Sequence, residues 1–163
     1  MFREMRRKKQ ALTEEECRDI LRQGTSGVLA VSGDDGYPYA VPLSYVPDGD
    51  KIYFHGATNG HKLDAIRRND KVSFCVIGQD LVVPEEYTTY FRSVIVFGRA
   101  RVLEEREEID HAITMLAKRY YPEDSAEHRA EMIEREYAAM AVIELRIEHM
   151  TGKEAGELAK RRR

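Results

Sequence analysis

The stretch "IYFHGATNGHKLDAIRRN", residues 52–69, joins an apolar strand to an amphipathic helix through a junction rich in glycine and histidine. The helical pattern begins at about Gly60, places Leu63 and Ile66 on one side, and ends near Asn69. The chemistry of this junction, and the strands that lie around it, determine the fold class and function that we expect.

The start of the helix combines features of an anion site. A helix N-terminus has unpaired backbone N–H groups and a partial positive charge, and Gly56 and Gly60 allow a ligand to approach the backbone closely. Lys62 stands in the first turn, where the helix dipole disfavours a cation unless an anion is bound. We therefore predict a phosphate site here, with His55 and His61 as further donors. The alternative, a loop glycine beside a solvated lysine, stays open on local sequence alone.

No metal site is expected. A zinc site built from His55, His61 and Cys75 would need a fourth ligand and closer spacing. Cys17 falls in a predicted helix and Cys75 in a predicted strand, so we interpret both as free thiols in a reducing compartment.

The chain before the junction has the period of short strands joined by turns. Asp-Gly and Pro-Asp-Gly supply the conformations that tight hairpins need, and Pro38 and Pro42 favour an edge position for the strand that contains them. The predicted meander consists of a strand at 26–32, a turn at 33–36, a strand at 37–46, a turn at 47–50 and a strand at 51–55.

The rest of the chain adds helices and two long strands. Thr13 and Glu16 form a capping-box pattern at the start of the first helix, and Gly98 marks a bulge or bend in a central strand. We predict helices at 14–23, 105–120 and 125–137 (opened by an Asp124 cap), strands at 71–78, 90–103 and 140–150, and a loop at 79–89. The predicted fold class is therefore mainly β, a barrel of about six antiparallel strands with about three or four peripheral helices.

Bulk properties limit the function. The 163 residues suit a single domain, 1–163, with short basic tails at 6–9 and 160–163. A net charge of −3 argues against nucleic acid as a partner. The N-terminus lacks the apolar segment of a signal peptide, and the chain lacks the run of roughly 18 apolar residues of a membrane helix. We expect a cytoplasmic protein without membrane contact.

Two more segments stand out beside the junction. In "RSVIVFG", residues 92–98, both alternating faces are largely apolar, which indicates a central strand with Arg92 at its rim and Ser93 in a barrel or interface. In "VPLSY", residues 41–45, a proline-interrupted strand leaves backbone groups free for a planar, hydrogen-bonding ligand. Ordinary packing would also explain both patterns.

Taken together, these segments resemble the pyridoxamine 5′-phosphate oxidase-like flavoproteins with the FMN-binding split-barrel fold, and among them the 5-nitroimidazole resistance (nitroimidazole reductase) proteins. The likeness covers almost the whole chain, and its most specific parts are F-H-G-A-x-x-G-H-K at 54–62 and S-V-I-V-F-G at 93–98. The chain is shorter than pyridoxamine phosphate oxidases, and the substrate-phosphate arginines of those enzymes find no match, so oxidation of pyridoxamine phosphate is not expected.

The resemblance implies a homodimer with FMN bound at the subunit interface. Gly60, His61 and Lys62 would hold the phosphate, and Arg92 is a weaker candidate for it. The residues that would lie along the flavin ring are Pro42, Leu43, Ser44, Tyr45, His55, Gly56, Ala57, Ser93 and Val94. Thr151 to Lys153 match the "TGK" of the family without an assigned role.

The resemblance further implies an FMN-dependent oxidoreductase that passes electrons to a small electrophile such as a nitroimidazole. His55, which ends a strand facing the presumed ring, is the first candidate for the catalytic histidine, and His61 is the alternative. Because no G-x-G-x-x-G fingerprint occurs, any nicotinamide donor would bind transiently over the flavin. A non-catalytic flavin- or haem-binding, redox-sensing module on the same fold is the alternative function.

Overall fold

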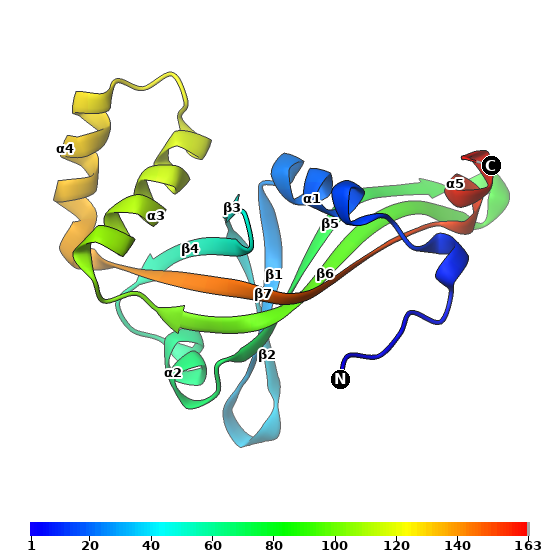
Figure 1. Ribbon diagram of the computed structural model, residues 1–163, viewed down its shortest axis with the longest axis horizontal. Coiled ribbons are helices and arrows are strands. Elements are labelled where there is room, and N and C mark those ends of the chain that lie inside the picture. Colours follow the sequence, from blue (N-terminus) through cyan, green and yellow to red (C-terminus); the bar gives the residue numbers. More distant parts are fainter. Residues whose placement is uncertain (163) are drawn as a thin grey trace.

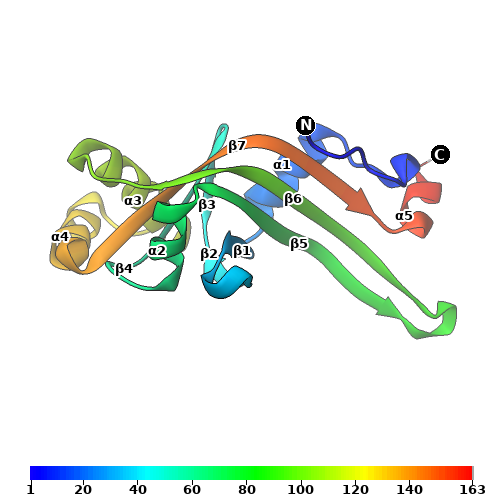
Figure 2. The same ribbon diagram turned by 90° about the horizontal axis from the view of Figure 1, so that it is seen from below.

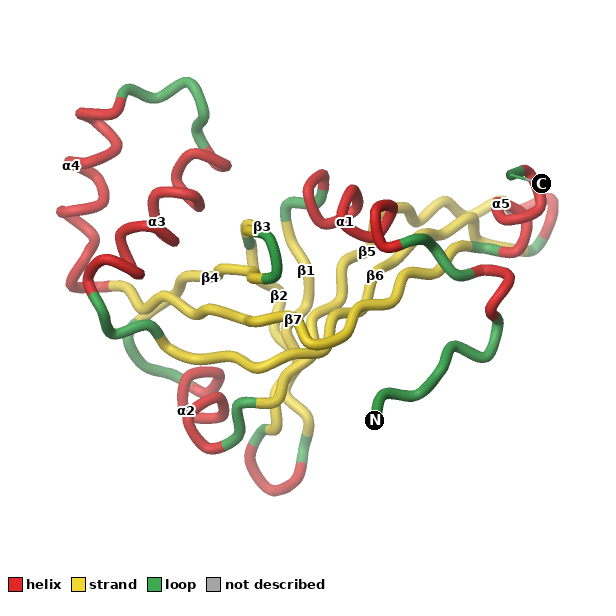
Figure 3. The backbone as a smooth tube through the Cα atoms, viewed as in Figure 1, coloured by secondary structure: helices red, strands yellow, loops and turns green. Residues whose placement is uncertain are grey.

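A computed structural model describes residues 1–162 and shows a strongly curved sheet with helices at its ends and along one face (Figures 1 and 3). Seven strands form the sheet: β1 (Ser26–Ser32), β2 (Pro38–Ser44), β3 (Val46–Asp48), β4 (Lys51–Ala57), β5 (Lys71–Val83), β6 (Thr88–Val102) and β7 (Met140–Glu154). The α-helices of the described chain are α1 (Glu14–Gln23), α2 (His61–Arg68), α3 (Arg106–Tyr120), α4 (Ala126–Glu136) and α5 (Gly156–Arg161).

All strand pairs are antiparallel, in the order β2-β1-β5-β6-β7-β4-β3. The sheet curls so that β2 also contacts β4, although the two are not paired. The result is the strand-rich, antiparallel half-barrel that the turn signals predicted. It has seven strands rather than about six, because Tyr45 interrupts the predicted strand 37–46 and separates β2 from β3.

The interior of the curl holds the main core. Aromatic rings meet edge to face at its centre, with Phe54 4.9 Å and Tyr45 5.0 Å from the ring centroid of Phe74. The Tyr45 hydroxyl donates a hydrogen bond of 2.7 Å to the carbonyl oxygen of Leu21 on α1. Tyr45 is fully buried, and burial raises the pKa of its phenol to about 12. The Tyr45 side chain therefore links the end of β2 to helix α1, which covers the core.

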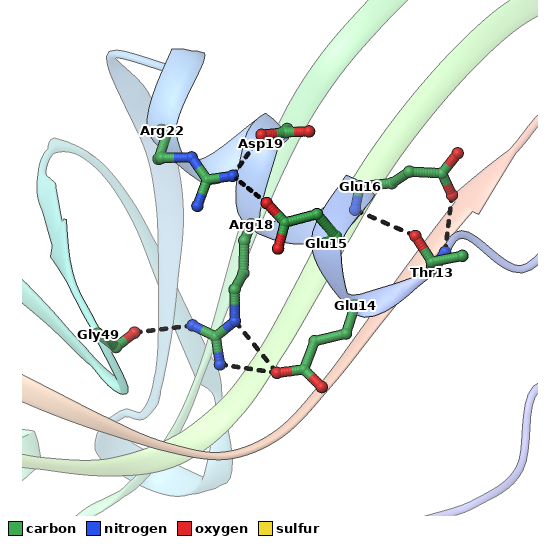
Figure 4. A network of polar contacts seen from close by, with 8 residues as sticks. All are labelled: Thr13, Glu14, Glu15, Glu16, Arg18, Asp19, Arg22 and Gly49. Carbon is green, nitrogen blue, oxygen red and sulfur yellow. Dashed lines mark hydrogen bonds and ion pairs between the residues drawn. The ribbon is translucent and has the colours of Figure 1, made fainter.

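Helix α1 begins with the predicted capping box. The backbone N–H of Glu16 donates to the Thr13 hydroxyl, and the N–H of Thr13 donates to the Glu16 carboxylate (Figure 4). Cys17 and Leu21 face the core. On the outer side, Arg18 pairs with Glu14 and donates 2.8 Å to the carbonyl oxygen of Gly49, which attaches the helix to the β3–β4 turn.

The predicted loop at 79–89 is wrong. These residues extend β5 and β6 into a long two-stranded ribbon that projects from the sheet (Figure 2), in register from Gln79 opposite Arg92 to Val83 opposite Thr88. Pro84 opens a short 3-10 turn at the tip instead of ending a strand. Polar residues on the ribbon's exposed faces obscured the alternation.

Smaller differences lie at element ends. Strand β4 continues to Ala57, so Gly56 and Ala57 are strand residues, and β7 continues to Glu154. Ser125, not Asp124, caps α4, because its hydroxyl accepts the N–H of His128. The predicted bulge at Gly98 is confirmed by a register shift between β6 and β7.

The predicted C-terminal tail is partly wrong. Residues 160–161 belong to helix α5, while Arg163 lies outside the described residues. Glu154, which is fully buried at the end of β7, pairs with Arg92 at 3.2 Å and with Arg162 at 2.5 Å. Arg162 also pairs with Glu16 in the capping box of α1. This cluster of charges joins the two ends of the chain.

We expect Glu154→Gln to lower the free energy of unfolding by about 2–3 kcal/mol, because two arginines lose a buried counter-charge. Glu134→Gln is the matched control, since Glu134 pairs with Arg106 at the surface and should change stability by less than about 1 kcal/mol. Urea unfolding followed by circular dichroism measures both; equal midpoints for the two variants would refute a stabilising role for the cluster.

Candidate functional site

Helix α2 begins at the end of β4 as the sequence predicted. Gly60, the N-cap residue, has φ 133° and ψ 174°, a conformation that side chains other than glycine rarely adopt. No side chain caps the helix, and the first intrahelical bond runs from the Asp64 N–H to the Gly60 carbonyl. The N–H groups of His61, Lys62 and Leu63 precede that bond and lack intrahelical partners. The helix therefore presents a row of N–H donors.

The Lys62 side chain folds back over the end of β4. A Cβ atom at Gly56 would lie 3.0 Å from Lys62 Nζ, so the ammonium group rests in the space that the missing side chain leaves. Burial, and then the charge of Lys62, lower the pKa of the His55 imidazole. His55, Gly56 and Lys62 thus form one group of neighbouring residues.

The two histidines lie in different surroundings. The His55 ring meets Tyr120 of α3 edge to face, with centroids 6.1 Å apart. The His61 ring stacks on Tyr39 of β2 at 4.1 Å, and its Nε2 lies 3.7 Å from an oxygen of Asp34. This Nε2 is buried and has no hydrogen-bond partner within the described residues. His61 therefore faces the β1–β2 hairpin, whereas His55 faces the helices α3 and α4.

The charge of Lys62 makes the pKa of His55 testable. Lys62→Ala should raise the His55 pKa, although burial keeps it below the usual range. A histidine with a lowered pKa stabilises the fold in its neutral form, and that contribution is lost as the pH falls through the folded-state pKa. In the variant, whose folded-state pKa lies closer to the unfolded value, this loss is smaller and is complete at a higher pH. Titration of the ring by NMR measures the shift; a His55 curve identical to wild type would contradict the proximity of the two groups.

The four residues 42–45 lie where β2 ends. Pro42 and Ser44 are exposed on this edge strand, and Leu43 packs against the core. The side chain of Tyr45 is inside the core, so only its backbone is free to meet a ligand.

Ser93 and Val94 lie on β6 with opposite orientations. Val94 is fully buried in the core, whereas Ser93 lines a surface cavity of about 270 Å³ with Thr151 and Lys153. Ser93, Thr151 and Lys153 are thus close together, which puts the "TGK" segment beside one predicted flavin residue. In one copy of the chain this cavity is separate from the residues around His55.

One face of the sheet is apolar and uncovered by helices. Cross-strand pairing places Val28, Cys75, Ile95 and Thr151 side by side across β1, β5, β6 and β7. Together with Ile77 and Phe97, which are 64% and 37% exposed, they form what we call the outer face. An apolar area of this kind is typical of a protein interface.

Sequence reasoning missed a cavity of about 700 Å³ between β4 and the helices α3 and α4. Its lining includes His55, Gly56 and Ala57 on one side and Tyr120 and Met132 on the other. Helices α3 and α4 are distant in sequence from β4, and only the exposed apolar residues of 125–137 hinted at an unfilled space.

The described residues contain neither a cluster of metal ligands nor a membrane-spanning helix. Within residues 1–162 no three His, Cys, Asp or Glu side chains gather as a metal site would require. No helix in the same range has the length and apolar character needed to span a bilayer.

Comparisons with solved structures reveal the same fold in other proteins. A conserved hypothetical protein from Mycobacterium tuberculosis is 21% identical with a TM-score of 0.81, covering 95% of this chain and 92% of that chain. A candidate 5-nitroimidazole antibiotic resistance protein from Bacteroides thetaiotaomicron is 21% identical with a TM-score of 0.71, covering 88% and 85%. A FAD-binding protein from Mesorhizobium loti is 27% identical with a TM-score of 0.66, covering 90% and 98%.

A search of curated proteins gave no match. The sequence model described as pyridoxamine 5′-phosphate oxidase matches residues 13–154, which is most of the chain and includes β1 to β7. The chain therefore belongs to the pyridoxamine 5′-phosphate oxidase family and has its split-barrel fold, which binds flavins.

Proposed function

We propose that this protein is a homodimeric FMN-dependent oxidoreductase that reduces a small electrophile such as a nitroaromatic compound. The observation that carries the proposal is the junction of β4 and α2, where the N–H donors of the helix and the ammonium group of Lys62 adjoin His55. In this proposal the start of α2 would hold the flavin phosphate, and His55, on the strand that leads into it, would lie toward the ring.

The residues at the junction fit a phosphate. Gly60 opens the helix without a side chain, and Gly56 leaves space for the Lys62 ammonium group. The His61 Nε2 lies toward Asp34 of the β1–β2 hairpin, so we assign His61 a backbone N–H contact to the phosphate. A dianion here would be stabilised by the helix dipole and by charge-assisted hydrogen bonds. FMN has such a group, and riboflavin does not.

The outer face supports a dimer in which the flavin ring lies between two copies. Its exposed apolar residues would be buried by a second chain, and Ser93 and the exposed residues Pro42 and Ser44 lie near its ends. Because Tyr45 and Val94 are core residues, we assign them backbone contacts only.

Ile95→Glu should convert the dimer to monomer, since a charge at the centre of the interface would be buried without a partner. Light scattering after gel filtration measures the mass, and circular dichroism should stay unchanged because Ile95 points away from the core. If Ile95→Glu still forms a dimer at the protein concentration at which wild type does, the outer face is excluded as the interface.

Bound FMN would supply two electrons after reduction by a nicotinamide donor. Conversion of a nitro group to a nitroso group and water consumes two electrons and two protons. His55 would take up one of these protons from solvent and pass it to the substrate as the imidazolium, and its lowered pKa makes that imidazolium the stronger acid.

The experiment is anaerobic mixing of the purified protein with NADH or NADPH and then with a nitroimidazole. Bleaching of the flavin, followed by its return as the nitro absorbance disappears, is the expected result. His55→Ala should slow the second phase when its rate is expressed for each bound flavin. A flavin that no donor reduces, or that reduces without nitro loss, would favour a non-catalytic flavin-binding module instead, and a Soret band in the absorbance spectrum would indicate haem.

A further inference from the structure

Helix α4 has no buried residue, although it is apolar on the side that faces the rest of the molecule. It stands beside α3 at the edge of the fold (Figure 1), and the 700 Å³ cavity lies between the two helices and β4. Contacts at its ends hold it in place, namely the Ser125 cap, the pair between Arg106 and Glu134, and Arg106 stacked 3.8 Å from the Tyr137 ring. A helix of 11 residues is only marginally stable without packing. Because α4 buries no residue, its inner side is available to pack against a ligand.

The wall of the cavity is mostly apolar at its surface, although charged residues such as Asp124, Arg129 and Glu136 also line it. Its middle is formed by Leu116 and Ala117 of α3, Met132 and Ile133 of α4, and Met140 at the start of β7. Its volume is in the range of small-molecule sites, which are mostly apolar with a few polar groups that orient the ligand. An uncharged, flat molecule is the chemical class that such walls accept.

Polar groups mark two parts of the cavity wall. His55 lies on the β4 side, edge to face with Tyr120. Arg129 of α4 lies on the other side, and its Nε is buried without a hydrogen-bond partner within residues 1–162. One terminal nitrogen of the guanidinium donates 3.0 Å to the carbonyl oxygen of Asp124. Its other terminal N–H groups can donate to an oxygen acceptor on a bound molecule.

We propose that the α3–α4 cavity is the substrate site for a neutral, planar aromatic molecule with a conjugated oxygen acceptor, and that α4 closes over it. The proposal deepens the function proposed above, because His55 belongs both to the junction that would hold the flavin and to the floor of the cavity. One edge of the ring would reach His55, and an oxygen of the molecule would accept a terminal N–H of the Arg129 guanidinium.

Binding of 4-nitroanisole to the purified protein, without electron donor, tests the proposal apart from turnover. Shifts of the methyl NMR signals of Ala117, Met132 and Met140 on titration report occupancy. Ala117→Phe, which fills the cavity, should raise the Kd at least about tenfold, while the flavin content and the oligomeric state remain those of wild type. Amide hydrogen exchange in α4 should slow when the probe binds.

Arg129→Lys keeps the charge but removes the planar guanidinium and its terminal N–H donors. This substitution should raise the Kd for 4-nitroanisole by about three- to tenfold. The Kd for anisole, which lacks the nitro oxygens, should stay unchanged. An unaltered Kd for Ala117→Phe would overturn the proposal. So would loss of flavin in that variant, which would mean that the cofactor fills the cavity, or a changed oligomeric state, which would mean that a second chain fills it. Probe binding needs neither an electron donor nor turnover. The binding result therefore tests the cavity even if the protein proves not to be an oxidoreductase.

Discussion

Replacement of Lys62 by alanine weakens FMN binding by about 10- to 100-fold, because a charge-assisted contact to a dianion contributes about 1.5–3 kcal/mol. The ammonium group lies beside Gly56 at the start of α2, next to the N–H donors that we assign to the phosphate. Fluorescence quenching of FMN by refolded or flavin-stripped protein gives the Kd of each variant.

Riboflavin separates a phosphate contact from a general loss of structure. It lacks the phosphate, so its affinity should be the same for wild type and Lys62→Ala. Lys118→Ala is the matched control, since Lys118 is exposed on α3 away from the junction. Equal FMN affinity for wild type and Lys62→Ala would refute the phosphate assignment, and an equal loss for FMN and riboflavin would show that Lys62 acts on the ring or on the fold instead.

Gly98→Ala should destabilise the fold by about 3 kcal/mol, or leave it unfolded, because overpacking against a rigid backbone cannot be relieved by a rotamer change. A Cβ atom at Gly98 would lie 2.1 Å from the carbonyl oxygen of Arg146 on β7. This close approach occurs where the β6–β7 register shifts, and the bulge is needed for the sheet to curl. Thermal unfolding by calorimetry measures the change.

Gly156→Ala is the control for this glycine. Its Cβ would meet only the side-chain amide of Gln10, 2.9 Å away, which is free to move, and the residue begins helix α5. We expect a change below about 1 kcal/mol, since alanine is the better helix former. Similar stabilities of Gly98→Ala and wild type would mean that the two strands are not this close.

Local chemistry explains the parts of the fold that the sequence predicted. The capping box at Thr13 and Glu16, the turn at Asp35 and Gly36 and the bulge at Gly98 depend on neighbouring residues, and each is present. The ribbon at 79–89 was missed because its stability comes from pairing between β5 and β6, while its side chains are mixed and largely exposed.

The candidate site was predictable only where one segment contains it. Residues 55–62 form the junction as the pattern indicated, because strand, glycines and helix start are consecutive. The resemblance carries Tyr45 and Val94 over to the flavin by their position in the sequence. Position does not say which face of a strand is inside, and the side chains of both residues are in the core. The cavity that contains His55 depends on α3 and α4, which pack from 50 or more residues further along the chain.

The absorbance spectrum of the freshly purified protein, with mass spectrometry of the ligand released by heat, tests the central claim most directly. We predict flavin bands near 375 and 450 nm as is general for oxidised flavins, one flavin for each chain, and the mass of FMN in the released fraction. A colourless protein that does not take up added FMN, a Soret band, or release of a cofactor other than FMN would contradict the account.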